Sequence, residues 1–180
     1  MHAKEALRAQ VLSRRSSMTR ADRAAAGSAL AAALTDVLDA ATSVAAYVSM
    51  GTEPATAELL VRRPDALLPV LCADGDLDWA VGGPFVPGAK GLLEPSGPRL
   101  GRDAIAGCDL VVVPALAVDL AGNRLGRGGG SYDRALSRAT GLTVALLYDG
   151  ETVDALPVEP HDAPVQSFAT PEGGLHRLHR

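Results

Sequence analysis

A glycine-rich stretch with two arginines and an aspartate is the part of the sequence best suited to chemistry. It reads R-L-G-R-G-G-G-S-Y-D-R over residues 124–134, with glycines at Gly126, Gly128, Gly129 and Gly130. Where such glycines follow a strand and precede a helix, backbone N–H groups can approach phosphate oxygens. Arg127 and Arg124 offer guanidinium groups that neutralise a transferring phosphoryl group, and Asp133 offers a carboxylate for Mg²⁺. The stretch therefore predicts phosphoryl chemistry.

The stretch matches neither common nucleotide fingerprint. A Walker loop needs Lys and then Ser or Thr after its last glycine, and the dinucleotide pattern needs glycine where Ser131 stands. The alternative is a flexible turn in which Asp133 caps a helix and Arg127 is solvated. The position of the glycines in the fold has to decide between these readings.

Apolar periodicity places the glycine-rich stretch in a single α/β domain over residues 1–180. Spacing and capping predict helices over 3–15, 19–40, 55–63 and 131–139. Apolar runs predict strands over 43–49, 66–73, 77–81, 109–114, 142–148 and 166–170. Residues 82–102 hold six glycines and four prolines, which predicts an irregular loop. We expect a sheet with helices on both faces, the glycine loop at the carboxyl end of a strand, and a frayed tail over 172–180.

Composition narrows the possible partners and the compartment. The net charge of −4 argues against a general nucleic-acid binder. No apolar run approaches about 18 residues, and residues 1–23 hold six basic residues against two acids, so we expect neither a membrane span nor a secretory signal. Cys72 and Cys108 stand singly in or beside apolar runs, as expected of structural thiols in a reducing compartment. These features predict a cytoplasmic protein.

Several segments, taken in order along the chain, resemble the sequence motifs of one enzyme family. They are the glycine-rich stretch after V-P-A-L-A-V-D, K-x-x-x-R at Lys4 and Arg8, Y-V-S-M-G-T-E-P-A-T over 47–56, E-P at 94–95, and L-P-x-E-x-H-D over 156–162. Together they resemble the 5-formyltetrahydrofolate cyclo-ligases, also called methenyltetrahydrofolate synthetases. The resemblance covers nearly the whole chain.

The resemblance implies an activity and a set of site residues. It implies ATP-dependent closure of 5-formyltetrahydrofolate to 5,10-methenyltetrahydrofolate with release of ADP and phosphate, and so ATP, Mg²⁺ and a reduced folate as ligands. Arg127 would face the transferring phosphoryl group as the catalytic residue. The residues expected at ATP are Lys4, Arg8, Arg124, Leu125, Gly126, Arg127, Gly128, Gly129, Gly130, Ser131 and Tyr132. Those expected at the folate are Met50, Glu53 and Tyr132, and those at the metal are Asp133 and Asp162.

The site residues also have ordinary structural readings. Lys4 and Arg8 lie one helical turn apart and suit a solvated basic face, and Glu53 suits a helix cap. Tyr132 suits packing against a sheet, and Asp162 suits a turn beside an exposed His161. Asp119, in D-L-A-G-N, is better explained by turn geometry than by catalysis, and His176 and His179 have no acid or thiol partner nearby for a metal.

Two departures from the family pattern leave other functions open. The family usually has a second aromatic where Ser131 stands and often an acid near Ala55. They suggest a folate- or nucleotide-binding homologue without turnover as one alternative. Another alternative is a sugar-phosphate isomerase or effector domain, because similar sheets with glycine loops also hold sugar phosphates.

Overall fold

The computed structural model describes residues 3–178, which begin with a helical segment. Helix α1 spans Ala3–Ser17, and α2 (Arg20–Ala33) begins at the expected capping box of Thr19 and Asp22. The single helix expected over 19–40 is wrong in one respect. It breaks at the buried Leu34, whose φ of −95° and ψ of 1° are not helical, and α3 (Thr35–Ala40) follows.

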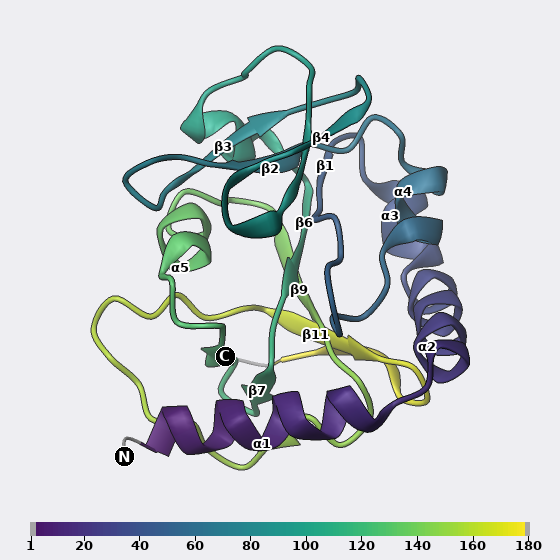
Figure 1. Cartoon of the computed structure of the whole chain (residues 1–180), viewed down its shortest axis with the longest axis vertical. Helices are drawn as coiled ribbons and strands as arrows, with labels where there is room; N and C mark the ends of the chain where they lie inside the picture. The colour runs from purple at the N-terminus through teal and green to yellow at the C-terminus, as the bar shows by residue number, and fades with distance from the viewer. Residues whose placement is uncertain (1–2, 179–180) are drawn as a thin grey trace.

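The central sheet has five strands in the order β1-β6-β9-β11-β12. Figure 1 labels the first four of them. The members of the sheet are β1 (Val44–Ala45), β6 (Leu110–Pro114), β9 (Leu142–Leu146), β11 (Ser167–Thr170) and β12 (Gly174–Arg177). The first four run parallel, with Val112 opposite Val144. Such strands are buried on both faces and read as continuous apolar runs, as the valines of β6 do.

Two predictions about the ends of the sheet are corrected. The strand expected over 43–49 pairs only at Val44 and Ala45. The tail expected to fray over 172–180 instead pairs as β12 against β11, where His176 stacks on Phe168 with ring centroids 5.0 Å apart. His179 lies outside the described residues.

Side chains alternate between the two faces of the sheet along each strand, and both faces are buried. Val111 and Val113 pack in one apolar cluster with Leu136 of α5 (Ser131–Leu136). Val112 packs in the other cluster, with Leu30 of α2 and Leu59 of α4 (Ala57–Arg62). Helices therefore cover both faces, as expected, with α2, α3 and α4 on one side and α5 on the other (Figure 1).

A short hairpin after β6 carries the chain to the glycine-rich stretch. Strand β7 (Ala117–Asp119) pairs antiparallel with β8 (Arg124–Leu125) and parallel with β10 (Thr152–Val153). Asp119 accepts hydrogen bonds from the amides of Ala121 and Asn123 at 3.0 and 2.9 Å, which confirms its role in the turn.

The remaining strands form two small hairpins away from α1 (Figure 1). They are β2 (Leu68–Leu71) with β3 (Leu77–Ala80), and β4 (Phe85–Pro87) with β5 (Leu93–Pro95). Short 3₁₀ segments lie at Ala89–Gly91 (η1) and Arg102–Gly107 (η2). The fully irregular loop expected over 82–102 is therefore wrong. The buried Glu94 of β5 accepts a hydrogen bond from the Leu71 amide at 3.1 Å and attaches the second hairpin to β2.

The two cysteines are free thiols, and no helix among residues 3–178 is long and apolar enough to cross a membrane. Cys108 is buried and Cys72 partly buried. Burial raises the pKa of the Cys108 thiol to about 11, which suits a structural role rather than a reactive one.

Gly27 allows α2 to lie close to the segment that precedes α4. A Cβ at Gly27 would stand 2.8 Å from the Ala55 Cβ and 3.0 Å from the Ala55 carbonyl oxygen. We expect Gly27→Ala to lower the free energy of unfolding by about 1–3 kcal/mol through overpacking, despite the better helix propensity of alanine. Urea unfolding measures the change. Adding Ala55→Gly should recover part of it, and a more stable Gly27→Ala protein would contradict the close contact.

Candidate active site

One cavity brings together the site residues expected from the sequence. It has a volume of about 440 Å³ and lies between α1, the loop after β1, the small hairpins and the glycine-rich stretch. The expected residues that line it are Lys4, Arg8, Met50, Glu53, Arg124, Leu125, Gly126, Arg127, Gly128, Gly129, Gly130, Ser131, Tyr132, Asp133 and Asp162. Every residue chosen from the sequence is thus at one place in the fold.

The glycine loop, residues 126–130, connects β8 to α5 along the wall of this cavity. Gly128 has a φ of +99°, a backbone conformation that side chains rarely permit, and Gly130 adopts a left-handed conformation directly before α5. Arg8 donates from Nε to the Gly126 carbonyl oxygen at 2.9 Å, so α1 is attached to the loop. The solvated basic face considered for Lys4 and Arg8 is therefore wrong, because Arg8 contacts the loop and Lys4, only 15% exposed, contacts Asp162.

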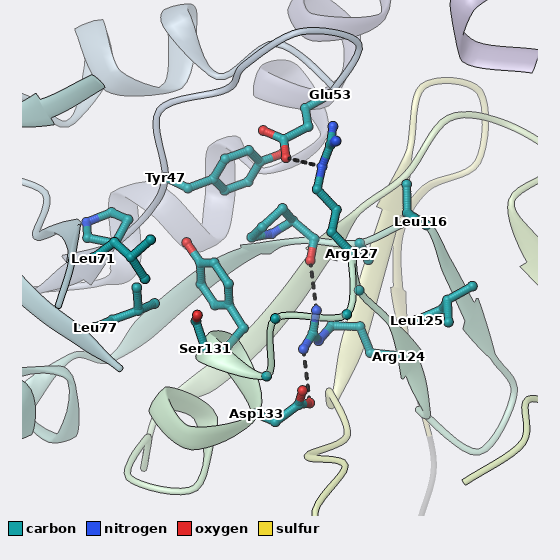
Figure 2. Close-up of a pocket in the computed structure, with 18 of the residues that line it drawn as sticks. Tyr47, Glu53, Leu71, Leu77, Leu116, Arg124, Leu125, Arg127, Ser131 and Asp133 are labelled. Atoms are coloured by element: carbon teal, nitrogen blue, oxygen red, sulfur yellow. Dashed lines mark hydrogen bonds and ion pairs between the residues drawn. The ribbon is translucent and has the colours of Figure 1, made fainter. Parts of the chain in front are cut away.

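Arg124 joins the end of β6 to the start of α5. Its Nη1 donates to the Pro114 carbonyl oxygen at 3.2 Å and its Nη2 to Asp133 Oδ1 at 3.0 Å (Figure 2). Its guanidinium carbon also lies 5.9 Å from the centre of the Tyr132 ring. Because the side chain is buried, this pair fixes the loop from within the protein. The sequence did not suggest this positioning role for Arg124.

Glu53 and Arg127 contact each other across the mouth of the cavity. Arg127 Nε lies 3.3 Å from Glu53 Oε1 (Figure 2). Glu53 Oε2 accepts a hydrogen bond from the Met50 amide at 3.0 Å. Glu53 therefore does not cap α4, which was the structural alternative. The Arg127 side chain is 47% exposed, so its guanidinium is free to meet a ligand.

Two tyrosines give the inner part of the cavity protonated hydroxyl groups. Burial, and after it the Glu53 carboxylate, raises the pKa of Tyr132, and the same two causes raise that of Tyr47. Tyr47 donates to the Pro54 carbonyl oxygen at 3.3 Å, whereas the buried Tyr132 hydroxyl has no partner among residues 3–178. Tyr132 also packs against the apolar clusters on both faces of the sheet. This confirms the packing role considered for it as the alternative to ligand binding.

Lys4 and Asp162 form an ion pair at the other side of the glycine loop. Their Nζ and Oδ2 atoms lie 2.6 Å apart, and the same oxygen accepts the Glu159 amide at 2.8 Å. Burial alone would raise the pKa of Asp162, but the hydrogen bonds from Lys4 and the Glu159 amide lower it below its usual value. His161 is exposed, as expected. A second hollow, behind the glycine loop, is lined by both Asp133 and Asp162.

The cavity also has lining residues that were not predicted from the sequence. Arg15 lies beneath it in a fully buried pair with Glu151, with Nε–Oε1 and Nη2–Oε2 distances of 2.8 and 2.7 Å. The spacing of Lys4, Arg8 and Arg15 puts all three on one face of a helix, a signal that could have indicated Arg15. The apolar wall formed by Pro69, Leu71, Leu77, Leu92 and Leu93 was missed as well.

Fold and cavity together define an α/β protein with a glycine loop suited to phosphate beside an apolar chamber. The chain belongs to the 5-formyltetrahydrofolate cyclo-ligase family, whose sequence model matches residues 1–171. It is 37% identical to the 5-formyltetrahydrofolate cyclo-ligase of Mycolicibacterium smegmatis over 192 residues, covering 98% of this chain and 97% of the relative. To the Escherichia coli K12 cyclo-ligase it is 39% identical over 66 residues, 35% of this chain and 36% of the relative.

Solved structures agree with this family assignment. The 5,10-methenyltetrahydrofolate synthetase of Aquifex aeolicus superposes with a TM-score of 0.85 at 27% identity, over 99% of this chain and 94% of the other. The synthetase from Mycoplasma pneumoniae, at 19% identity and a TM-score of 0.73 over 93% and 98% of the two chains, shares the fold.

Proposed function

We propose that this protein catalyses the ATP-dependent cyclisation of 5-formyltetrahydrofolate to 5,10-methenyltetrahydrofolate, with release of ADP and phosphate. The observation that carries the proposal is one cavity lined by two unlike sets of residues. Lys4, Arg8 and the glycine loop line one part of it, and Leu71 and Leu77 line another. Figure 2 places these leucines across the cavity from Leu116 and Leu125. Such a cavity suits a phosphate chain and a flat ring system side by side.

The reaction needs positioning and charge neutralisation more than a protein nucleophile. The formyl oxygen is a poor leaving group, so it first takes the γ-phosphoryl group while the bond from phosphorus to ADP breaks. The neighbouring nitrogen then attacks the formyl carbon and loses its N–H proton, and the carbon–oxygen bond breaks to release phosphate. Fixed donors aimed at the transferring group supply most of the rate enhancement in such transfers.

We assign the phosphate-binding role to the glycine loop with the cations of α1. Backbone amides of residues 126–130 would bind phosphate oxygens, and Lys4 and Arg8 would neutralise part of the triphosphate charge. Leu125, Ser131 and Tyr132 would complete the nucleotide site at the two ends of the loop. Arg127, the cation at the cavity mouth, would stabilise the charge on the transferring phosphoryl group.

Met50, Glu53 and Tyr132 would bind the pterin. Glu53 is held beside the cavity by the Met50 amide, where its carboxylate suits the amine and N–H groups of a pterin edge. The Tyr132 hydroxyl, which has no partner within residues 3–178, is a donor or acceptor for the ligand, and the ring offers a face for stacking.

The residues expected at Mg²⁺ fit that ion in their donor chemistry. Asp133 and Asp162 each direct one carboxylate oxygen to a cation of the protein, Arg124 and Lys4. Among residues 3–178 the other oxygen of Asp133 has no hydrogen bond, and that of Asp162 has only His161 Nε2 at 3.9 Å. Both side chains also line the hollow shared with Gly128–Gly130. Mg²⁺ prefers such oxygen ligands together with phosphate oxygens, and it would neutralise charge on the transferring phosphates.

We also propose that residues 1–180 act as one domain and that the enzyme works in the cytoplasm, where its two free cysteines would stay reduced.

Purified protein mixed with 5-formyltetrahydrofolate and Mg-ATP should give a rise in near-ultraviolet absorbance from the methenyl product, with one ADP released per product. The Arg127→Ala variant serves as the matched blank. Tight binding of folate and nucleotide without ADP release would instead favour the binding homologue suggested by Ser131 and Ala55. Indifference to ATP would point to a sugar-phosphate protein.

A further inference from the structure

Lys90 stands apart from the other cations that line the cavity. Five of them already contact protein acceptors: Lys4 with Asp162, Arg8 with Gly126, Arg15 with Glu151, Arg124 with Asp133 and Arg127 with Glu53. Lys90 lines the same cavity and, among residues 3–178, has neither a hydrogen bond nor an ion pair. A cation without a partner at the rim of a ligand cavity is suited to an anion of the ligand.

The backbone at Lys90 is also exceptional. It is the one non-glycine residue among residues 3–178 with a positive φ, at φ 55° and ψ 27°. A left-handed conformation costs a residue with a side chain about 1–2 kcal/mol relative to the right-handed one. Residues kept in such conformations concentrate at ligand sites, where the surrounding structure enforces them.

The turn that carries Lys90 is fixed to the cavity wall through Glu94. A side chain at Gly88 would overlap the buried Glu94 carboxylate, so the turn closes tightly over it. Glu94 in turn accepts the Leu71 amide, and Leu71 lines the cavity. The turn therefore presents Lys90 together with Leu92 and Leu93 on the same apolar wall.

The proposed substrate has a negatively charged end that suits Lys90, the lining cation without a partner among residues 3–178. A folate carries its pterin at one end and the two carboxylates of a glutamate at the other, with an aminobenzoyl ring between them. With the formyl group next to Arg127, that ring would run along the leucine wall, and the glutamate would reach the rim. Resting on the proposed function, we propose that Lys90 binds a glutamate carboxylate of the folate and determines the preference for glutamylated substrates.

The test compares 5-formyltetrahydrofolate with 5-formyltetrahydropteroate, which lacks the glutamate. Lys90→Asn removes the charge, and asparagine tolerates the positive φ at this position. Lys90→Arg keeps the charge. Arg20→Asn is the matched control, because it removes an exposed charge outside the cavity. We expect Lys90→Asn to raise KM for the glutamate-bearing substrate about two- to fivefold, the size of one exposed ion pair. Lys90→Arg should keep KM for the glutamate-bearing substrate close to the wild-type value. KM for the pteroate should be the same with and without Lys90.

An equal KM increase for both substrates, or no increase for either, would overturn the role of Lys90. Wild-type protein that binds 5-formyltetrahydrofolate but forms no methenyl product would overturn the proposed function instead. The Lys90 comparison is then made from calorimetric Kd values for the two folates without ATP. A glutamate-dependent loss of affinity in Lys90→Asn would still support the inference, and its absence would defeat it.

Discussion

Replacing Arg127 with alanine should lower kcat by about two to three orders of magnitude, the usual loss when one charge-stabilising donor is removed. Its charge counts mainly when the phosphoryl group is in transfer, so the Kd for 5-formyltetrahydrofolate should change by less than about threefold. Stopped-flow turnover and calorimetric folate titration measure the two effects on the same preparation.

Two further variants separate the effect of Arg127 on the phosphoryl group from its contact with Glu53. Arg127→Lys keeps the charge but loses the planar fork of donors, and should recover only part of the turnover. Combining Arg127→Ala with Glu53→Gln removes the carboxylate left without its partner. If Arg127→Ala instead weakened folate binding as much as it lowered kcat, its main role would be holding Glu53.

The second large effect concerns stability. Removing Glu151 should lower the free energy of unfolding by about 3–5 kcal/mol, because the Arg15 charge stays buried without its partner. The two side chains are only 1% and 0% exposed, and Glu151 also accepts the Tyr148 amide at 2.8 Å. Arg15 donates further to the Ala115 carbonyl oxygen at 2.7 Å. The pair thus attaches α1, with Lys4 and Arg8, to the strands beneath the cavity.

Chemical unfolding of Glu151→Leu, and of the double variant with Arg15→Met, tests this attachment. The double variant should be more stable than Glu151→Leu alone, since it buries no unpaired charge. Asp39→Ala breaks the exposed Arg62–Asp39 pair, whose side chains are 39% and 59% exposed, and should cost less than about 1 kcal/mol. A Glu151→Leu loss no larger than that of Asp39→Ala would contradict the structural role of the pair.

Local patterns were enough to predict the middle of the fold. The burial of the β6 valines, and of the leucines at four-residue steps in α2 and α3, could be predicted from residue type and spacing. Thr19 with Asp22 marks a helix start. Pairing between strands, which residue types alone do not indicate, decided the parts that were missed. Strands β4 and β5 pair in a glycine- and proline-rich segment because Glu94 attaches them to β2, and β12 forms because β11 offers it an open edge.

The same distinction holds for the cavity. The glycine loop could be chosen from its residue types, and the cavity gathers every residue chosen with it. The Arg15–Glu151 pair joins residues 136 apart in sequence, and the Arg127–Glu53 pair joins residues 74 apart. Helical spacing could have indicated Arg15 itself, but no local spacing indicates the acidic partner of either arginine. Lys90 was missed because the lack of a hydrogen bond or ion pair between it and the rest of residues 3–178 is a property of the folded chain.

The central claim is that the glycine loop holds the triphosphate in the same cavity as the folate. A crystal structure of the protein with a non-hydrolysable ATP analogue, Mg²⁺ and 5-formyltetrahydrofolate tests it most directly. We predict phosphate oxygens against the amides of residues 126–130, with the γ-phosphate between Arg127 and the formyl oxygen. A nucleotide bound away from that loop, with the folate still in the cavity, would contradict the account.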